Sequence, residues 1–274
     1  MNGTSELRDI DFERISQLVY ELCGINLHDG KKELVRARLN KRLRNGNFGS
    51  FAQYFKYVTT EEGSDELIVM IDSLSTNLTS FFREEKHFRK LHEILPEMVG
   101  ASSRCRFRIW CAGCSTGEEP YSLAITLKEV LNGRGQGADL KIMATDISTR
   151  VLRAAAAGIY SGDRIKKIPQ LLLRKYFQMG QGKWQGNYRV KKDLKNIVEF
   201  MRFNLMEKPS FDEPFDIIFC RNVMIYFDKE TQGRLIDRFY NCLKEKGWLF
   251  IGHSESLTGL NHSFKYIEPS VYRK

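Results

Sequence analysis

Apolar residues in the first part of the chain recur at the three- and four-residue spacing of amphipathic helices. The spacing is clear in three segments: 11–24, 51–58 and 67–74. Gly24 follows the first segment as a helix stop signal, and Ser50 precedes the second as a cap. The pattern predicts an all-helical N-terminal domain over residues 1–75.

The periodicity changes at residue 106, where short apolar strands begin to alternate with helices. Strands are predicted at 106–111, 141–146, 197–203, 215–220 and 248–253. Helices are predicted at 120–131, 148–157 and 228–246. Strands that alternate with helices form a mostly parallel sheet with right-handed crossovers. We therefore expect an α/β domain with a sheet of about seven strands, which the tail at 264–274 closes as an antiparallel pair.

Residues 158–196 do not follow this alternation. Their Gly, Trp, Tyr and Val residues are typical of short antiparallel strands and turns. They predict a small β insert in the sheet domain. A Gly-rich turn at 132–137 lengthens the connection between the first two strands.

The composition is that of a folded cytoplasmic protein. The 274 residues are 42% hydrophobic and 12% aromatic, which is enough for a sizeable core. The chain has no run of about 18 apolar residues and its first residues are charged, so neither a membrane span nor an export signal is expected. Six scattered cysteines are too few for a disulfide framework and are expected to be mostly reduced.

The positive charge of the chain indicates an anionic partner. The net charge is +9 and the pI is 9.2, which suits nucleic acid, an anionic membrane surface or an acidic protein surface. Segment 31–44 is a predicted basic helix, which includes Arg36, Arg38, Lys41 and Arg42. Two interpretations of this helix stay open: an ordinary solvated surface, or a face that binds an anionic partner.

The stretch WCAGCSTGEEPYS at 110–122 contains a C-x-x-C pair, Cys111 and Cys114. A structural zinc site needs four ligands, and a thioredoxin-type pair needs a helix directly after the first cysteine. Neither pattern is present, so no metal site and no redox site is predicted there.

The same stretch contains two glycines, Gly113 and Gly117, between a predicted strand and a predicted helix. The stretch matches neither of the two common phosphate-binding glycine motifs, G-x-x-x-x-G-K-[ST] and G-x-G-x-x-G. Glu118 and Glu119 begin the helix, where the helix dipole favours their carboxylates but where they would repel a pyrophosphate. A ligand with a positive charge and no phosphate is therefore expected, and S-adenosylmethionine fits that description.

Polar residues also follow the other predicted strands. Asp146 ends the strand at 141–146, where an acid can accept hydrogen bonds from both hydroxyls of a ribose. The other interpretation makes Asp146 a helix N-terminal acid beside Ser148. Arg221, Asn222 and Tyr226 follow the strand at 215–220, and ligands of open α/β sheets bind at such strand ends.

Four motifs resemble the CheR family of chemotaxis receptor methyltransferases. They are LSTNLTSFFRE (74–84), CAGCSTGEEPYSLAITL (111–127), ATDIS (144–148) and FDIIFCRNVMIYFDK (215–229). The resemblance covers almost the whole chain. It implies a seven-stranded, Rossmann-like S-adenosylmethionine-dependent methyltransferase domain over 101–274 with a β insert at about 158–196, an all-helical domain over 1–75, and a linker and helix over 76–100 that contribute to the active site.

The resemblance also implies roles for individual residues. Arg83 and Tyr226 are the implied catalytic residues. The implied cofactor-binding residues are Asn77, Thr79, Arg83, Ala112, Gly113, Glu118, Glu119, Asp146, Ile147, Asn204, Leu205, Arg221 and Asn222. The spacing does not decide which of Glu118 and Glu119 holds the ammonium group of the cofactor.

The implied reaction transfers a methyl group from S-adenosylmethionine to glutamate side chains of chemoreceptors, and leaves S-adenosylhomocysteine. The implied partner is the cytoplasmic helical bundle of the receptor, which is rich in Glu and Gln and could dock on Arg36, Arg38, Lys41 and Arg42. Some members of the family also bind a C-terminal receptor peptide through the β insert. No metal, no nucleic acid and no direct membrane insertion are expected.

Two other functions remain alternatives. A methyltransferase of the same fold could act on a small acid or an amine, although the basic helix would then have no role. A non-catalytic nucleic-acid-binding protein would suit the net charge of +9. Against it, segment 31–44 has no stacking aromatic residues between its basic residues, and the acidic pair is unsuited to phosphates.

Overall fold

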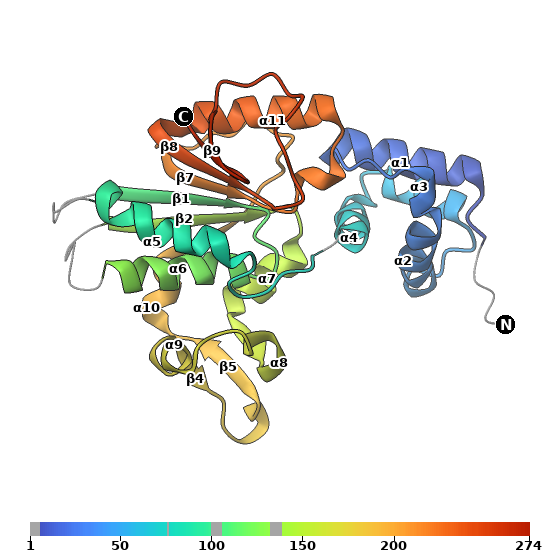
Figure 1. The fold of residues 1–274 in the computed structure, drawn as a ribbon. Coiled ribbons are helices and arrows are strands. Elements are labelled where there is room, and N and C mark those ends of the chain that lie inside the picture. Colours follow the sequence, from blue (N-terminus) through green and yellow to red (C-terminus); the bar gives the residue numbers. More distant parts are fainter. Residues whose placement is uncertain (1–5, 76, 100–105, 132–138) are drawn as a thin grey trace. The chain divides into compact units, whose positions relative to one another are not determined.

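The computed structural model describes residues 6–75, 77–99, 106–131 and 139–274 (Figure 1). The chain divides into two compact units. The first contains residues 1–76 and 226–231, and the second contains 77–225 and 232–274. The Gly-rich turn expected at 132–137 lies outside the described residues. No helix in the described part of the chain is long and apolar enough to cross a membrane.

The first unit is helical. Its elements are α1 (Asp9–Cys23), η1 (Asp29–Lys31), α2 (Lys32–Asn45), α3 (Phe51–Val58) and α4 (Ser64–Leu74). Gly24 ends α1 with a left-handed φ of 72°, and the Ser50 side chain caps α3 by accepting a hydrogen bond from the Gln53 N–H. The apolar faces form a shared core, in which Ile15 and Leu39 are fully buried.

The second unit is built on a seven-stranded sheet with the order β6-β2-β1-β7-β8-β10-β9. Its strands are β1 (Arg106–Ala112), β2 (Asp139–Asp146), β6 (Val198–Arg202), β7 (Phe215–Cys220), β8 (Leu243–Ile251), β9 (Lys265–Glu268) and β10 (Val271–Arg273). The first five are parallel, and β10 pairs antiparallel with both β8 and β9. The predicted sheet, with its antiparallel edge, is confirmed.

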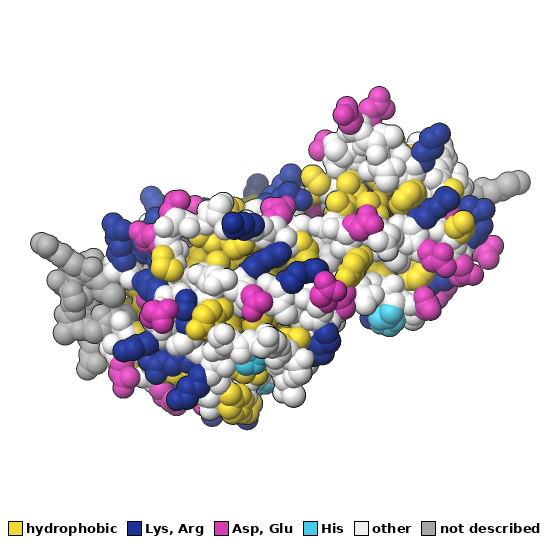
Figure 2. Space-filling view, turned by 90° about the horizontal axis from the view of Figure 1, so that it is seen from above, with side chains coloured by type: hydrophobic (Ala, Val, Ile, Leu, Met, Phe, Trp, Pro, Cys, Tyr) yellow, Lys and Arg dark blue, Asp and Glu magenta, His cyan; other side chains and the backbone are white. Residues whose placement is uncertain are grey.

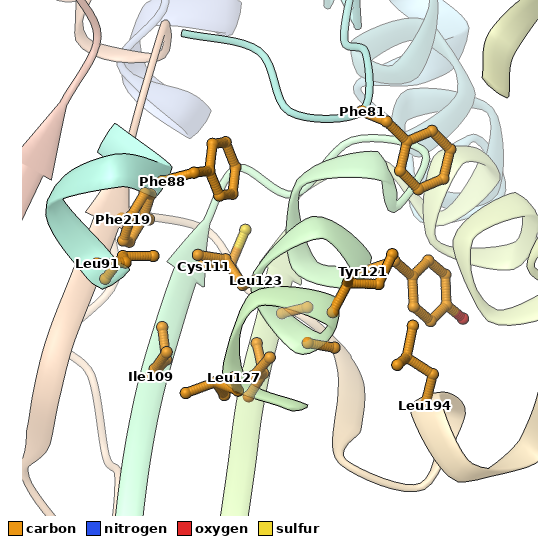
Figure 3. Close-up of a cluster of buried hydrophobic side chains, with 14 of the residues drawn as sticks. Phe81, Phe88, Leu91, Ile109, Cys111, Tyr121, Leu123, Leu127, Leu194 and Phe219 are labelled. Atoms are coloured by element: carbon orange, nitrogen blue, oxygen red, sulfur yellow. The ribbon is translucent and has the colours of Figure 1, made fainter. Parts of the chain in front are cut away.

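Helices cover both faces of this sheet (Figure 1). They are α5 (Glu85–Val99), α6 (Glu118–Val130), α7 (Thr149–Ala157), α10 (Lys192–Lys195) and α11 (Lys229–Cys242). In the view of Figure 1, α11 lies above the sheet and α5 and α6 lie below it. Figure 3 shows part of the core on the α5 and α6 side, where Phe88 and Leu91 of α5 and Leu123 of α6 pack toward Ile109 of β1.

The insert forms its own three-stranded sheet with the order β3-β5-β4. Its elements are β3 (Ile159–Ser161), α8 (Gly162–Ile165), α9 (Gln170–Tyr176), β4 (Phe177–Met179), η2 (Gly182–Trp184) and β5 (Asn187–Val190). All strand pairs are antiparallel. The small antiparallel β insert predicted for 158–196 is confirmed.

Most predicted boundaries differ from the structure by one or two residues, and the largest error lies between the last long helix and β8. The helix predicted over 228–246 ends at Cys242, and β8 begins at Leu243 instead of at 248. The polar run at 244–246 resembles a helix end in sequence. Backbone pairing of Leu243 with Phe215 of β7 makes this run part of the strand.

Candidate functional site

The strand order reverses between β1 and β7, because β2 and β6 lie on one side of β1 and β7 and β8 lie on the other. Open α/β sheets bind ligands at such a switch point, beyond the carboxyl ends of the strands. The loop at 113–117 follows β1, Asp146 ends β2, and Arg221 follows β7. The topology therefore brings three of the predicted motifs to one edge of the sheet.

The loop after β1 is shaped by two glycines with left-handed backbones. Gly113 has a φ of 85°, and a Cβ atom there would lie 2.4 Å from a methyl group of Val223. Gly117 has a φ of 95°, and a Cβ atom there would lie 2.7 Å from the Tyr160 hydroxyl. Both positions therefore require glycine for conformation and for space.

Asp146 connects the loop after β1 with the start of α7 and with the residue that follows β6. Its carboxylate accepts hydrogen bonds from the N–H groups of Ser115 (2.8 Å) and Ser148 (2.9 Å), and its backbone carbonyl accepts one from Phe203 beyond β6 (3.1 Å). The carboxylate is therefore the helix N-terminal acid of α7. An ionised carboxylate has about four lone-pair sites, so this role is compatible with additional hydrogen bonds to a ligand.

The two glutamates of the loop have different partners. Glu118 is fully buried, accepts a hydrogen bond from the Thr116 hydroxyl (2.7 Å) and pairs with Arg164 of the insert. Glu119 accepts a hydrogen bond from the Cys111 thiol (3.1 Å) and pairs with Arg221 (2.8 Å). Neither carboxylate pairs with the other's arginine in the described part of the chain.

Arg221 is a buried cation between two carboxylates. Its side chain is 1% exposed and pairs with Glu119 and with Glu84 (3.0 Å), and it also donates to the Arg83 carbonyl. Burial is the largest single influence and raises the pKa of Glu84, but the charge and hydrogen bond of Arg221 together with the backbone N–H of His253 outweigh it and hold that pKa below its ordinary value. This network fixes the start of α5 against the end of β7.

Glu255 is an important residue that the sequence interpretation missed. Its carboxylate accepts hydrogen bonds from the backbone N–H groups of Asn222 (2.9 Å), Val223 (3.0 Å) and Gly252 (2.5 Å). These bonds hold the loop after β7, where Asn222 has a left-handed φ of 58°. Burial raises the pKa of Glu255. Its only signal in the sequence is its place after the strand at 248–253.

The linker residues Asn77, Thr79 and Arg83 belong to the second unit. The Asn77 carbonyl accepts a hydrogen bond from the Ser115 hydroxyl (3.0 Å), which brings the linker to the loop after β1. Arg83 donates to the carbonyl of Leu78 (2.9 Å) and is half-buried.

The other predicted residues of the second unit lie at the same edge of the sheet. Ala112 ends β1 and is buried, and Ile147 directly follows β2. Asn204 and Leu205 follow β6, and Asn204 accepts a hydrogen bond from the Met206 N–H (3.0 Å). Tyr226 instead belongs to the first unit, where its carbonyl accepts a hydrogen bond from the Asn26 N–H (2.8 Å).

The basic residues of α2 differ in how far they are committed to the first unit. Arg42 forms two bonds with Glu66, and Arg38 donates to the carbonyls of Leu74 (2.6 Å) and Ser75 (3.1 Å). Arg36 pairs on the surface with Glu33, whereas Lys41 is exposed. On the face drawn in Figure 2, Lys and Arg side chains alternate with acidic and apolar ones.

The C-x-x-C pair is buried in the second unit. Cys111 and Cys114 are free thiols, and burial raises the pKa of both well above the ordinary value. Such thiols are poor nucleophiles and poor metal ligands at neutral pH. The buried Cys111 thiol donates a hydrogen bond to Glu119, so we interpret Cys111 as a structural residue.

The sheet order, the glycine loop at the switch point and the acid at the end of β2 define a Rossmann-like methyltransferase fold. Residues 77–273 match the family model "CheR methyltransferase, SAM binding domain", and residues 10–75 match "CheR methyltransferase, all-alpha domain". The chain belongs to the CheR methyltransferase family.

Curated relatives are similar over nearly the whole chain. A chemotaxis protein methyltransferase of Borreliella burgdorferi is 44% identical over 96% of this chain and 94% of its own. Those of Salmonella typhimurium and Escherichia coli are 44% and 43% identical, over 97% of this chain and 90% and 91% of theirs. Among solved structures, a SAM-dependent methyltransferase from Methanosarcina mazei is 16% identical over 58% of this chain and 55% of its own, with a TM-score of 0.33.

Proposed function

We propose that the protein is an S-adenosylmethionine-dependent protein-glutamate O-methyltransferase that esterifies glutamate side chains of chemoreceptors. The observation that carries this proposal is the match of residues 77–273 to the SAM-binding domain of the family. The named relatives, which are chemotaxis protein methyltransferases, support chemotaxis as its setting. The enzyme is proposed to act in the cytoplasm, on the helical bundle of the receptor.

The residues at the switch point suit this cofactor. When bound, S-adenosylmethionine supplies a methyl group on a cationic sulfonium. The two loop carboxylates, Glu118 and Glu119, each pair with an arginine that a cationic ligand can replace or share, and Asp146 has acceptor capacity for a ribose. The remaining cofactor-binding residues implied by the resemblance are proposed to complete this site.

We assign the ammonium group of the cofactor to Glu118. Arg164, the partner of Glu118, has a side chain that is 41% exposed, so it can swing into solvent. Arg221, the partner of Glu119, is 1% exposed and is also held by Glu84. A ligand cation can displace the exposed arginine at little cost, whereas displacing Arg221 from Glu119 would take one of its two carboxylates from a buried charge.

The chemistry requires orientation more than proton transfer. A glutamate side chain has a reference pKa of about 4.3, so it is ionised at neutral pH and needs no general base. The opposite charges of nucleophile and sulfonium cancel during transfer, so a dry site favours the transition state over separated ions. Arg83 is proposed to align the substrate carboxylate, and Tyr226 is proposed as a catalytic residue, as the resemblance implies.

The receptor is proposed to dock on the basic residues of α2. Arg36 and Lys41 are the ones that reversal can test, because Arg38 and Arg42 also stabilise the first unit. Reversal of Arg36 and Lys41 to Glu should weaken receptor methylation and leave cofactor affinity unchanged. A C-terminal receptor peptide is proposed to pair with an edge strand of the insert, whose sheet ends in β3 and β4.

The proposal is tested by calorimetric titration with S-adenosylmethionine and S-adenosylhomocysteine, followed by methylation of a receptor cytoplasmic fragment with labelled cofactor. Binding of both compounds and alkali-labile incorporation, as expected for an ester, are the predicted results. Binding of neither compound would overturn the cofactor assignment. Binding followed by alkali-stable incorporation would keep the cofactor and overturn the glutamate ester.

A further inference from the structure

Two histidines and a glutamate form a cluster in the second unit, and the glutamate also pairs with Arg221. Glu84 lies just before α5, His87 lies in its first turn, and His253 lies beyond the end of β8. One ligand atom of each residue lies within 4.8 Å of the others. The mechanism proposed above uses none of these three side chains directly.

His87 is the unusual member of this cluster. It is 1% exposed, and neither ring nitrogen has a hydrogen-bond partner in the described part of the chain. Its ring packs edge-on against Phe250 at 5.5 Å and against His253 at 4.8 Å between ring centroids. A buried imidazole without partners is costly, so a ligand that accepted its lone pair would remove that cost.

The separations suit a small metal ion. The Nδ1 atom of His87 lies 3.5 Å from a carboxylate oxygen of Glu84. Two ligands of a tetrahedral zinc ion, each about 2.0–2.1 Å from it, lie roughly 3.3 Å apart. The third ligand, His253, is exposed, and rotation of its side chain can close the remaining distance. Its exposure leaves an entry path for the ion, and three protein ligands leave the fourth position open.

The local charge permits a cation there, although it imposes a competition. Glu84 and Glu119 carry two negative charges and Arg221 carries one positive charge, so the group has a net charge of −1. Because the same Glu84 oxygen faces both His87 and Arg221, a metal ion at this position must share that carboxylate with the guanidinium or take it over.

We propose that Glu84, His87 and His253 form a binding site for a divalent first-row transition-metal ion, with two imidazoles and one carboxylate as ligands. Zinc is the natural probe, because this ligand set with an open position is found in zinc enzymes. The ion draws Glu84 away from Arg221. Because Arg221 is one of the proposed cofactor-binding residues, the ion thereby weakens binding of the cofactor. Only this last effect rests on the proposed function.

The metal site itself is tested without any activity measurement. Zn²⁺ binding to the full chain is measured by competition with a chromophoric chelator, and Co²⁺ binding by absorption spectroscopy. His253→Gln should lower Zn²⁺ affinity at least about tenfold, because the loss of even an outer-shell partner of a metal ligand costs about that much. His92→Gln is the matched control, because His92 is exposed on α5, the helix that carries His87, and lies outside the cluster.

Several outcomes overturn the site. They are the absence of binding, unchanged affinity in His253→Gln, an equal loss in the His92→Gln control, and a thiolate-to-cobalt band that places the ion on cysteines. His87→Gln should reproduce the loss seen with His253→Gln. If His87→Gln does not fold, the exposed His253 still decides the question.

The effect on the cofactor is a separate measurement. Titration of S-adenosylhomocysteine with and without Zn²⁺ should show weaker binding in the presence of the ion, and His253→Gln should remove the difference. Zn²⁺ binding that leaves cofactor affinity unchanged would overturn the antagonism and keep the metal site. Failure to bind the cofactor in metal-free buffer would instead count against the proposed function.

Discussion

Reversal of Arg42 to Glu separates a structural role of α2 from its proposed docking role. The Arg42 guanidinium makes two bonds to Glu66, one of them 2.8 Å long, and Glu66 also accepts a hydrogen bond from the buried Tyr54 hydroxyl (2.9 Å). Arg36 makes only a surface pair with Glu33. The two arginines look equivalent in sequence but differ in burial.

The expected cost follows from the exposure of each pair. The side chains of Arg42 and Glu66 are 23% and 17% exposed, whereas those of Arg36 and Glu33 are 41% and 72% exposed. Breaking a fully buried pair costs about 3–5 kcal/mol, and breaking an exposed pair about 0–1 kcal/mol. Allowing for partial exposure, we expect Arg42→Glu to cost about 2–3 kcal/mol, and Arg36→Glu less than about 1 kcal/mol.

Calorimetry and urea unfolding of both variants provide the assay. A loss of about 2–3 kcal/mol in a helical unit of this size should lower its melting temperature by roughly 10 °C or more. A double-mutant cycle with Arg42→Gln and Glu66→Gln should show positive coupling of about 2 kcal/mol. If Arg42→Glu melts within about 2 °C of Arg36→Glu, the structural role argued for Arg42 is wrong.

Three further predictions concern the loop, the cofactor and pH. Gly117→Ala should cost about 2–3 kcal/mol in urea unfolding, because it forces a left-handed residue against Tyr160; a neutral result would contradict the strained loop. Glu118→Gln should weaken S-adenosylhomocysteine binding at least about tenfold by calorimetry while retaining stability. Glu119→Gln should mainly lower stability, because the buried Arg221 then keeps Glu84 but loses its second carboxylate; the reverse pattern would refute the ammonium assignment. Burial raises the pKa of Cys23 to about 11. The folded protein therefore retains this proton above the pKa of the unfolded chain, and the free energy of unfolding should fall as pH rises from about 9 to 11. Cys23→Ala should reduce that fall by about 2–3 kcal/mol, and the same dependence of stability on pH in both proteins would disprove the prediction.

Local patterns in the sequence determined most of the architecture. Apolar spacing predicted the N-terminal helices, and alternating apolar segments predicted β7 at 215–220 with both ends correct. The adjacent charges of Glu118 and Glu119, which are visible in the linear sequence, were enough to disfavour a phosphate ligand at the loop. These features depend on neighbours within one turn or one strand, so a linear pattern contains them.

Only the tertiary structure decided how charges are paired. The sequence presents Arg36, Arg38 and Arg42 as one basic face, yet Arg42 is committed to Glu66, a residue of another helix. It likewise gives no reason to join Arg221 to Glu84, 137 positions away. Whether an ionised side chain binds a ligand or stabilises the fold depends on its burial and on the opposite charge beside it, and both arise from contacts distant in the chain.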